Sequence, residues 1–319
     1  MRQIRSILKS VNKEKPKILT VFTSFSQLKM LEGFDVYCLI VEQFSSPKVN
    51  DGIPGIIFIN DWRPLEFDLC VSFTGGIIGK TLSDIALERH IDCITYELNY
   101  PTDISTCMDY ISSNKSSIFP SESFKKKVSP NGNNKVITPS ICPSFASLVP
   151  PSARQINAVT YGDFLFEREY ETNFSDWRSI VNTLPSQIYG FNPRLGTHNP
   201  TQAEFANILT NTKVFINLRT SGFFPMEVLQ AMACGCVIIS YPFPGIDSFV
   251  NAVQLKKNKE ECREMLSYVL ANEHYLNIIS AANLSFAKNF KSNLFGQYIK
   301  ETWENINEFG FQHYRISGL

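Results

Sequence analysis

Short, continuous apolar runs alternate with amphipathic segments along this chain, and the alternation occurs twice. Continuous apolar runs of strand length are typical of strands that are covered on both faces. In the first half, we expect strands at 17–23, 34–44, 55–61, 68–74 and 92–98. In the second half, we expect strands at 157–164, 186–191, 213–219 and 237–240.

Helical periodicity fills the intervals between these runs. Helices are expected at 82–90, 174–184, 201–211, 225–234, 260–270, 274–290 and 294–308. Ser175 and Thr201 stand where two of these helices begin and are predicted to cap them. Strand–helix–strand alternation favours parallel, doubly wound sheets. The sequence therefore predicts an α/β protein with two Rossmann-like domains facing a cleft, where ligands bind at the carboxyl ends of the strands.

The Pro-rich segment 137–155 is predicted to link the two domains. We place the domains at 1–150 and 151–290 and expect residues 291–319 to form a helix that packs back on the first domain. Segment 112–135 is polar and is expected to be an exposed loop or a weak helix. A length of 319 residues suits two domains.

Charge is balanced overall but uneven along the chain. A net charge of zero argues against a protein coated with positive charge for nucleic acid. The first 17 residues nevertheless predict an amphipathic helix with a basic face. That face, like Lys125–Lys127, is either solvated or in contact with lipid or nucleic-acid phosphates. No apolar run is long enough to span a membrane and no signal-peptide core is present, so a cytoplasmic protein is expected.

The eight cysteines include no C-x-x-C pair and suggest buried free thiols in a reducing compartment. Cys234 and Cys236 are predicted to pack a tight turn rather than to bind a metal. The stretch "TGGIIGKTLSD" (74–84) fails the P-loop spacing, because Gly75 lies one residue too close to Gly79. Gly75 and Gly76 instead predict a loop that a ligand can approach, or a plain tight turn.

The stretch "PMEVLQAMACGCVIIS" (225–240) resembles the nucleotide-sugar-binding half of glycosyltransferases with the GT-B fold. In that family a Glu that holds the donor ribose falls where this chain has Gln230. An amide can accept from one hydroxyl and donate to another, so the resemblance implies that Gln230 binds the ribose. The family's first Glu would fall near Ser221 or Gly222, where no acid exists, and Glu227 is the nearest substitute.

Two further stretches fit the same resemblance, which covers about residues 156–290. In "VTYGDFLFEREYE" (159–171), Gly162 would approach the donor diphosphate and Arg168 would bind it. In "IYGFNPRL" (188–195), Gly190 closes a strand and Arg194 is a second phosphate-binding candidate. A surface ion pair of Arg168 with a neighbouring glutamate is the alternative interpretation.

The stretch from Phe73 to Pro101 is similar in layout to phage DNA β-glucosyltransferase. There, a Gly-Gly loop, a helix and a strand lead to the catalytic base. The matching acid is Glu97, and Asp103 and Asp61 are the other candidates. A strand-end carboxylate with a structural role is the alternative for Glu97.

The resemblance implies transfer of a sugar from a nucleotide-diphosphate sugar, most readily a UDP-sugar, to an acceptor hydroxyl. It implies no permanently bound cofactor, and the absence of a D-x-D triplet fits a mechanism without metal. The acceptor would be a hydroxymethylated pyrimidine in phage DNA, with action in the host cytoplasm. The alternatives are a cell-envelope or lipid-linked glycan at the membrane surface, a non-catalytic GT-B binding module, and an epimerase of the same fold.

Overall fold

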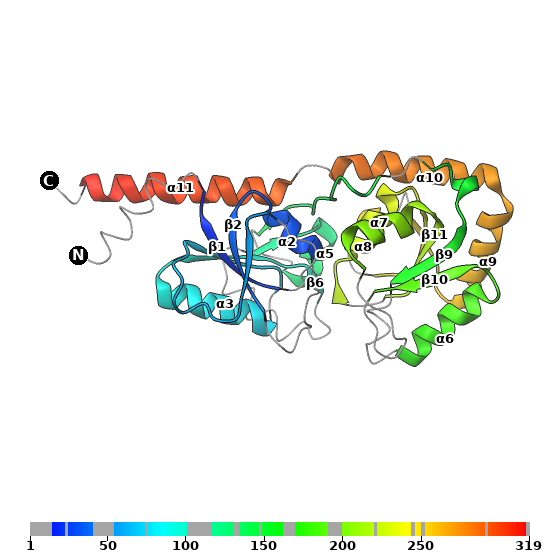
Figure 1. Cartoon of the computed structure of the whole chain (residues 1–319), viewed down its shortest axis with the longest axis horizontal. Coiled ribbons are helices and arrows are strands. Elements are labelled where there is room, and N and C mark those ends of the chain that lie inside the picture. Colours follow the sequence, from blue (N-terminus) through cyan, green and yellow to red (C-terminus); the bar gives the residue numbers. More distant parts are fainter. Residues whose placement is uncertain are drawn as a thin grey trace.

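The chain folds into two parallel β-sheets with helices on both faces, and the two units lie side by side along the long axis of the molecule (Figure 1). The computed structural model describes residues 15–22, 25–40, 54–74, 76–100, 117–129, 134–146, 149–161, 170–190, 200–219, 222–243, 246–249, 253–290 and 293–316. The predicted α/β fold with two Rossmann-like domains is confirmed. None of the described helices is long and apolar enough to cross a membrane.

The first sheet has the strand order β3-β2-β1-β4-β5-β7-β8, and all its pairings are parallel. Its strands are β1 (Lys17–Val21), β2 (Asp35–Leu39), β3 (Ile56–Ile59), β4 (Leu69–Ser72), β5 (Asp92–Tyr96), β7 (Ser117–Phe119) and β8 (Lys135–Val136). The strand order reverses between β1 and β4, which makes this the switch point where ligands bind in doubly wound sheets.

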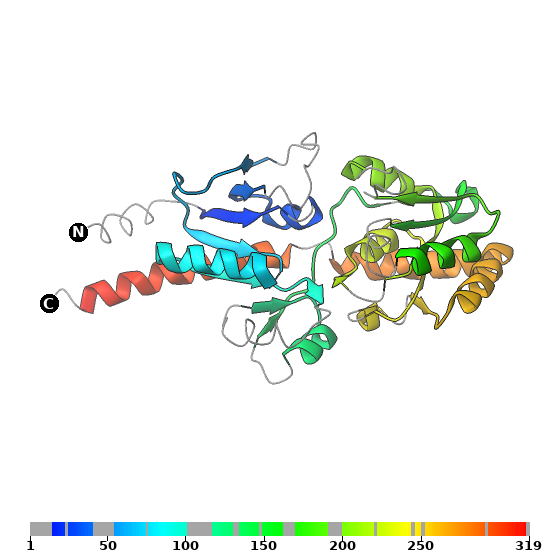
Figure 2. The ribbon, with the colours of Figure 1, turned by 90° about the horizontal axis from the view of Figure 1, so that it is seen from below.

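Helices α3 (Gly76–Arg89) and α11 (Leu294–Ile316) cover opposite faces of the first sheet. Alternation along β1 explains this, because Ile18 belongs to the apolar cluster with α11 and Leu19 to the cluster with α3. Helix α11 runs from the junction of the two domains back along the first domain (Figures 1 and 2).

The second sheet has the order β10-β9-β11-β13-β14, again entirely parallel, with its switch point between β9 and β11. Its strands are β9 (Ile156–Tyr161), β10 (Ser186–Tyr189), β11 (Thr212–Asn217), β13 (Val237–Ser240) and β14 (Val253–Leu255). Helices α6 (Tyr170–Val181) and α9 (Lys259–Ala271) cover one face. Helices α7 (Gln202–Thr210) and α8 (Met226–Ala233) cover the other, and α10 (Glu273–Ala287) packs against α8 and α9 at the edge of both apolar clusters.

One of the two predicted helix caps is confirmed and one is wrong. Thr201 caps α7 in a capping box: its hydroxyl accepts from the Glu204 N–H at 3.2 Å, and the Glu204 carboxylate accepts from the Thr201 N–H at 2.7 Å. Ser175 lies inside α6, which begins at Tyr170. Helix α3 likewise begins at Gly76, earlier than predicted.

The polar segment 112–135 is more structured than its composition predicts. It contributes β7 and the helix α5 (Glu122–Val128), whose Phe124 is fully buried. Ser121 caps α5 by accepting from the Phe124 N–H. A few apolar residues at buried positions therefore outweigh the polar average of the segment. The predicted basic helix over the first 17 residues lies almost wholly outside the described residues.

Two chain segments cross between the domains and lie side by side. The Ile141 N–H of the first crossing donates to the Phe290 carbonyl, close to the second crossing, at 2.7 Å. The first residues of α11 then enter the first domain. There the Phe295 ring stacks on the Tyr96 ring, with 4.6 Å between the ring centroids, and packs against the Phe73 ring, with 5.7 Å between the centroids. The carboxyl ends of β4 and β5 are therefore covered by the start of α11.

The turn at Cys234–Cys236 packs tightly, as predicted. Gly235 adopts a φ of 72°, and both flanking cysteines are fully buried. Burial raises the pKa of the Cys234 thiol to about 12. The Arg154 guanidinium clamps the turn by donating to the Gly235 carbonyl at 3.0 Å and the Thr212 carbonyl at 2.8 Å. Among the described residues, no His, Cys, Asp and Glu side chains are grouped so that they could hold a metal ion.

Candidate functional site

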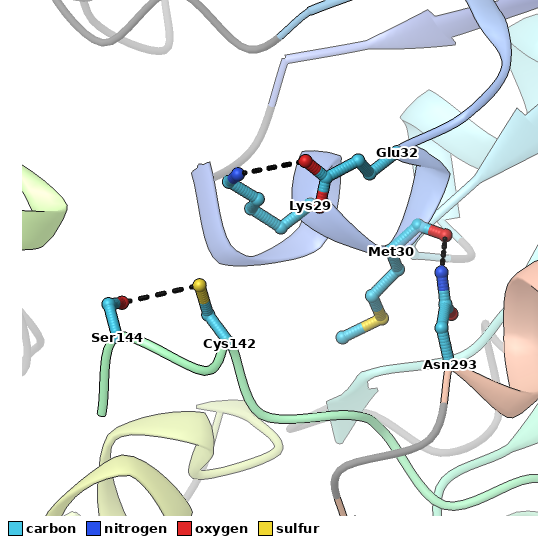
Figure 3. Close-up of polar contacts among 6 residues, drawn as sticks. All are labelled: Lys29, Met30, Glu32, Cys142, Ser144 and Asn293. Atoms are coloured by element: carbon cyan, nitrogen blue, oxygen red, sulfur yellow. Dashed lines mark hydrogen bonds and ion pairs between the residues drawn. The ribbon is translucent and has the colours of Figure 1, made fainter. Parts of the chain in front are cut away.

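A cavity of about 190 Å³ lies between the two domains. Its first-domain wall is formed by Lys29 of the turn η1 (Lys29–Leu31) and by Glu32, and the crossing segment around Cys142 lies opposite them (Figure 3). The second domain contributes the first residues of α7 and α8 and the side chain of Gln230. Polar groups from both domains therefore converge on one site, as expected of a ligand site at a domain interface.

Gln230 is the predicted site residue that lines this cavity. It sits in the second half of α8, where its side chain is only 3% exposed, and Met226 lines the same wall one turn earlier. Residues four apart share one face of a helix, which explains why both face the cavity. Glu227 is half-buried on the neighbouring face of α8. It is not among the described residues that line the cavity.

Gly190 directly follows β10 and has a φ of 95°. A Cβ there would lie 2.8 Å from the Tyr161 ring, so the glycine allows this aromatic side chain to pack at the ends of β9 and β10. Packing alone is thus a sufficient reason for this glycine. The other predicted phosphate-binding residues, Gly162, Arg168 and Arg194, lie outside the described residues.

Glu97 directly follows β5 and is 1% exposed. Its N–H donates to the Ile118 carbonyl at 2.7 Å. The next residues form β6 (Asn99–Tyr100), which pairs antiparallel with β12 (Gly222–Phe223) of the second domain. This two-stranded bridge continues as a hydrogen bond from the Phe224 N–H to the Leu98 carbonyl. The bridge ties the chain that carries Glu97 to the residues that lead into α8.

The two other candidate bases are placed differently. Asp61 is exposed beyond the edge strand β3, and its carboxylate pairs with the Arg63 guanidinium at 3.2 Å. Asp103 lies outside the described residues. Of the two candidate acids that the structure describes, Glu97 is the buried one, and it lies beside the interdomain bridge.

The glycine loop after β4 is described in part. Gly76 begins α3 with a φ of 60°, and a Cβ there would meet no atom within 4 Å among the described residues. The space beside it is compatible with a ligand near the start of the helix, at the switch point of the first sheet. Gly75 lies outside the described residues.

Arg219 is a candidate that the sequence patterns did not single out. It stands two residues after β11, at the carboxyl edge beside the switch point of the second sheet, and is only 6% exposed. Its N–H donates to the Asn217 side chain at 3.4 Å, and Asn217 donates to the Ser240 hydroxyl at 2.8 Å. A buried guanidinium at a ligand-binding edge suits an anionic group. The available signal was a single charge that closes the apolar run "KVFINLR".

Part of the chain matches one protein-family model, and the whole fold is similar to several solved structures. Residues 153–291 match the family model described as "Glycosyl transferase-like". No curated protein matches the chain.

Solved structures match over nearly the whole chain. The sucrose-phosphate synthase of Thermosynechococcus elongatus is 12% identical, with a TM-score of 0.64 over 94% of this chain and 98% of that one. HepE of Anabaena, in complex with UDP and glucose, is 13% identical, with a TM-score of 0.64 over 91% of this chain and 100% of HepE. WaaG, a glycosyltransferase involved in lipopolysaccharide biosynthesis, is 9% identical, with a TM-score of 0.61 over 90% of this chain and 99% of WaaG. These similarities establish the GT-B fold.

Proposed function

We propose that this chain, whose residues 153–291 form a glycosyltransferase-like domain within a GT-B fold, transfers a sugar from a UDP-sugar to an acceptor hydroxyl. The observation that carries the proposal is the position of Gln230, which lines the cavity between the two domains from within that domain. The choice of uridine is supported by HepE, which was solved with UDP and with UDP-glucose.

In this proposal the donor lies against the second domain. The Gln230 amide accepts from one ribose hydroxyl and donates to the other. Arg219, with Arg168 and Arg194, neutralises the diphosphate, because a guanidinium binds phosphate oxygens through paired N–H donors. Gly162 lets the backbone approach the donor, and Gly190 acts through the Tyr161 ring that its missing Cβ admits. Glu227 is a further donor-binding candidate in place of the missing first Glu.

Glu97 is proposed as the general base. Its carboxylate takes the proton of the acceptor hydroxyl as the oxygen attacks the anomeric carbon and the bond to the diphosphate breaks. The departing diphosphate gains negative charge, which the arginines stabilise. The bridge of β6 and β12 supports this role, because it joins the segment after Glu97 to the residues that precede α8.

For the acceptor, the order of segments over 73–101 supports a hydroxymethylated pyrimidine in phage DNA. The alternative, a cell-envelope or lipid-linked glycan, is supported by the likeness of fold to WaaG and by the basic amphipathic sequence at the start of the chain. With one UDP-sugar as donor, transfer to hydroxymethylated DNA or to a lipid-linked glycan would identify the acceptor. Donor binding without transfer to any acceptor would favour a non-catalytic module.

Thermal shift with a panel of nucleotides and nucleotide sugars tests the donor site. A ligand at 100 times its dissociation constant adds about 2.7 kcal/mol of stability, which is easily measured. A rise in melting temperature with a UDP-sugar is expected. If no nucleotide or nucleotide sugar raises the melting temperature, the donor-site proposal is wrong.

Gln230→Ala is expected to weaken UDP binding about tenfold, because it removes hydrogen bonds to both ribose hydroxyls. Gln230→Glu, which restores the carboxylate of the resembling enzymes, is expected to retain binding. Gln187→Ala, on an exposed position of β10, is the matched control. Isothermal titration with UDP is the measurement, and unchanged affinity of the Gln230→Ala variant would remove Gln230 from the ribose site.

Arg219→Gln is expected to lower the affinity for UDP about tenfold and to leave the affinity for uridine unchanged, because hydrogen bonds to a charged group are the stronger ones. Arg263→Gln on the exposed face of α9 controls for the loss of one positive charge. An equal loss of uridine and UDP binding would show that Arg219 supports the fold of the site rather than the diphosphate.

A further inference from the structure

The first-domain wall of the interdomain cavity carries an ion pair that the proposed donor site does not use. Lys29 and Glu32 both line the cavity, across from Gln230 of the second domain. The Lys29 ammonium donates to the Glu32 carboxylate at 3.3 Å, with the two side chains 25% and 52% exposed (Figure 3). An ion pair as exposed as this contributes little to stability. Separating Lys29 from Glu32 therefore costs little.

The turn that presents this pair is held firmly in place. Met30 and Leu31 are buried in the first-domain core. The Met30 carbonyl accepts from the Asn293 side chain at 2.9 Å (Figure 3). Asn293 in turn accepts from the Gly296 N–H in the first turn of α11. The backbone of η1 is thus fixed to the core and to a crossing segment. The long, flexible Lys29 side chain therefore extends from a rigid backbone at the edge of the cavity.

The surroundings of the cavity favour an anion. The turn η1 follows β1, whose carboxyl end is at the switch point of the first sheet. From the second domain, Gln202 and Met226 are the first residues of α7 and α8, so the N-termini of two helices lie at the cavity, each with one glutamate in its first turn, Glu204 and Glu227, that offsets part of the helix dipole. Glu32 is the one acidic side chain among the residues that line the cavity in the described part of the chain.

We propose that the Lys29 ammonium separates from Glu32 and binds the diphosphate of the nucleotide. The nucleotide would then contact the first domain through Lys29 and the second domain through Gln230, and would bridge the two. This inference rests on the proposed function, because it assigns a second wall to the same donor site. Glu32 competes with the nucleotide for the Lys29 ammonium. Each residue of the pair therefore affects affinity in the opposite direction.

Isothermal titration of UDP and uridine into the native protein, Lys29→Met, Glu32→Gln and the double variant tests the proposal. Lys29→Met is expected to lower UDP affinity about tenfold, the effect of losing a hydrogen bond to a charged group, with uridine unchanged. Glu32→Gln is expected to raise UDP affinity, because it removes the competitor. The double variant is expected to behave like Lys29→Met alone. Lys126→Met, at an exposed position of α5, is the matched control.

Each result bears on the proposal. Native UDP affinity in Lys29→Met would overturn it while leaving the proposed function intact. A loss of UDP affinity in Glu32→Gln would also overturn it, because the pair would then act as one structural unit. A native protein that binds no UDP would overturn the proposed donor and this inference together. Melting temperatures of all variants would show whether the fold is retained.

Discussion

Replacing Glu97 with glutamine is expected to lower turnover by about 100-fold or more, the usual contribution of a general base. Glutamine has nearly the same shape as glutamate, so the side chain still fills its buried position after β5. It cannot take a proton from the acceptor hydroxyl. UDP affinity is expected to stay at the native value, because the base contacts the acceptor and not the nucleotide. Steady-state kinetics and titration with UDP provide the two measurements.

Two controls separate a catalytic from a structural role for Glu97. Asp61→Asn removes an exposed carboxylate and is expected to turn over at the native rate. Glu97→Asp keeps a carboxylate and is expected to retain part of the activity that Glu97→Gln loses. Near-native turnover in Glu97→Gln would place the base elsewhere. A parallel fall in melting temperature and turnover would indicate that Glu97 supports the interdomain bridge instead.

Replacing Gly235 with alanine is expected to destabilise the protein by about 3 kcal/mol. A φ of 72° costs a residue with a Cβ about 1–2 kcal/mol. The new Cβ would also lie 2.8 Å from the Ser280 hydroxyl and 3.1 Å from both the Arg154 guanidinium and Leu284. Arg154 cannot move away without loss of its hydrogen bonds to two carbonyls. Crowding in a packed core adds about 1–3 kcal/mol.

Gly33→Ala is the matched control for this substitution. Gly33 also has a positive φ, of 96°, but a Cβ there would meet no described atom within 4 Å. The control should therefore lose only the backbone term, about 1–2 kcal/mol. Urea unfolding of both variants measures the difference. Equal losses of stability would show that the contacts around Gly235 add nothing to the cost of its conformation.

The regular elements of this fold were predictable because their signals are local. Each expected strand from 17–23 to 237–240 corresponds to a strand of one of the two sheets, since a continuous apolar run has few other places to be buried. The helix that carries Gln230 and the strand that follows it were predictable for the same reason, because their apolar residues lie close together in the sequence. The starts of α3 and α6 were not, because the two glycines in the first turn of α3 and the polar residues Glu171 to Asn173 in α6 are poor indicators of a helix.

The parts of the candidate site that sequence patterns missed depend on distant contacts. Asn293 supports the turn at Met30 across 263 positions of the chain. The pairing of β6 with β12 joins two-residue strands that carry no recognisable periodicity. Arg219 looked like the polar end of a strand until the sheet order placed it beside a switch point. Local periodicity contains no information about which distant residues meet.

The largest apolar cluster passes through both domains without interruption. It includes Ile18 and Tyr96 of the first sheet together with Phe224, Leu229 and Ile238 of the second domain. Enzyme engineers often exchange donor and acceptor halves between two-domain transferases to combine specificities. In this chain the cut between the sheets would divide one core, so a working chimera would have to keep matched apolar residues on both sides of the cut and the pairing of β6 with β12.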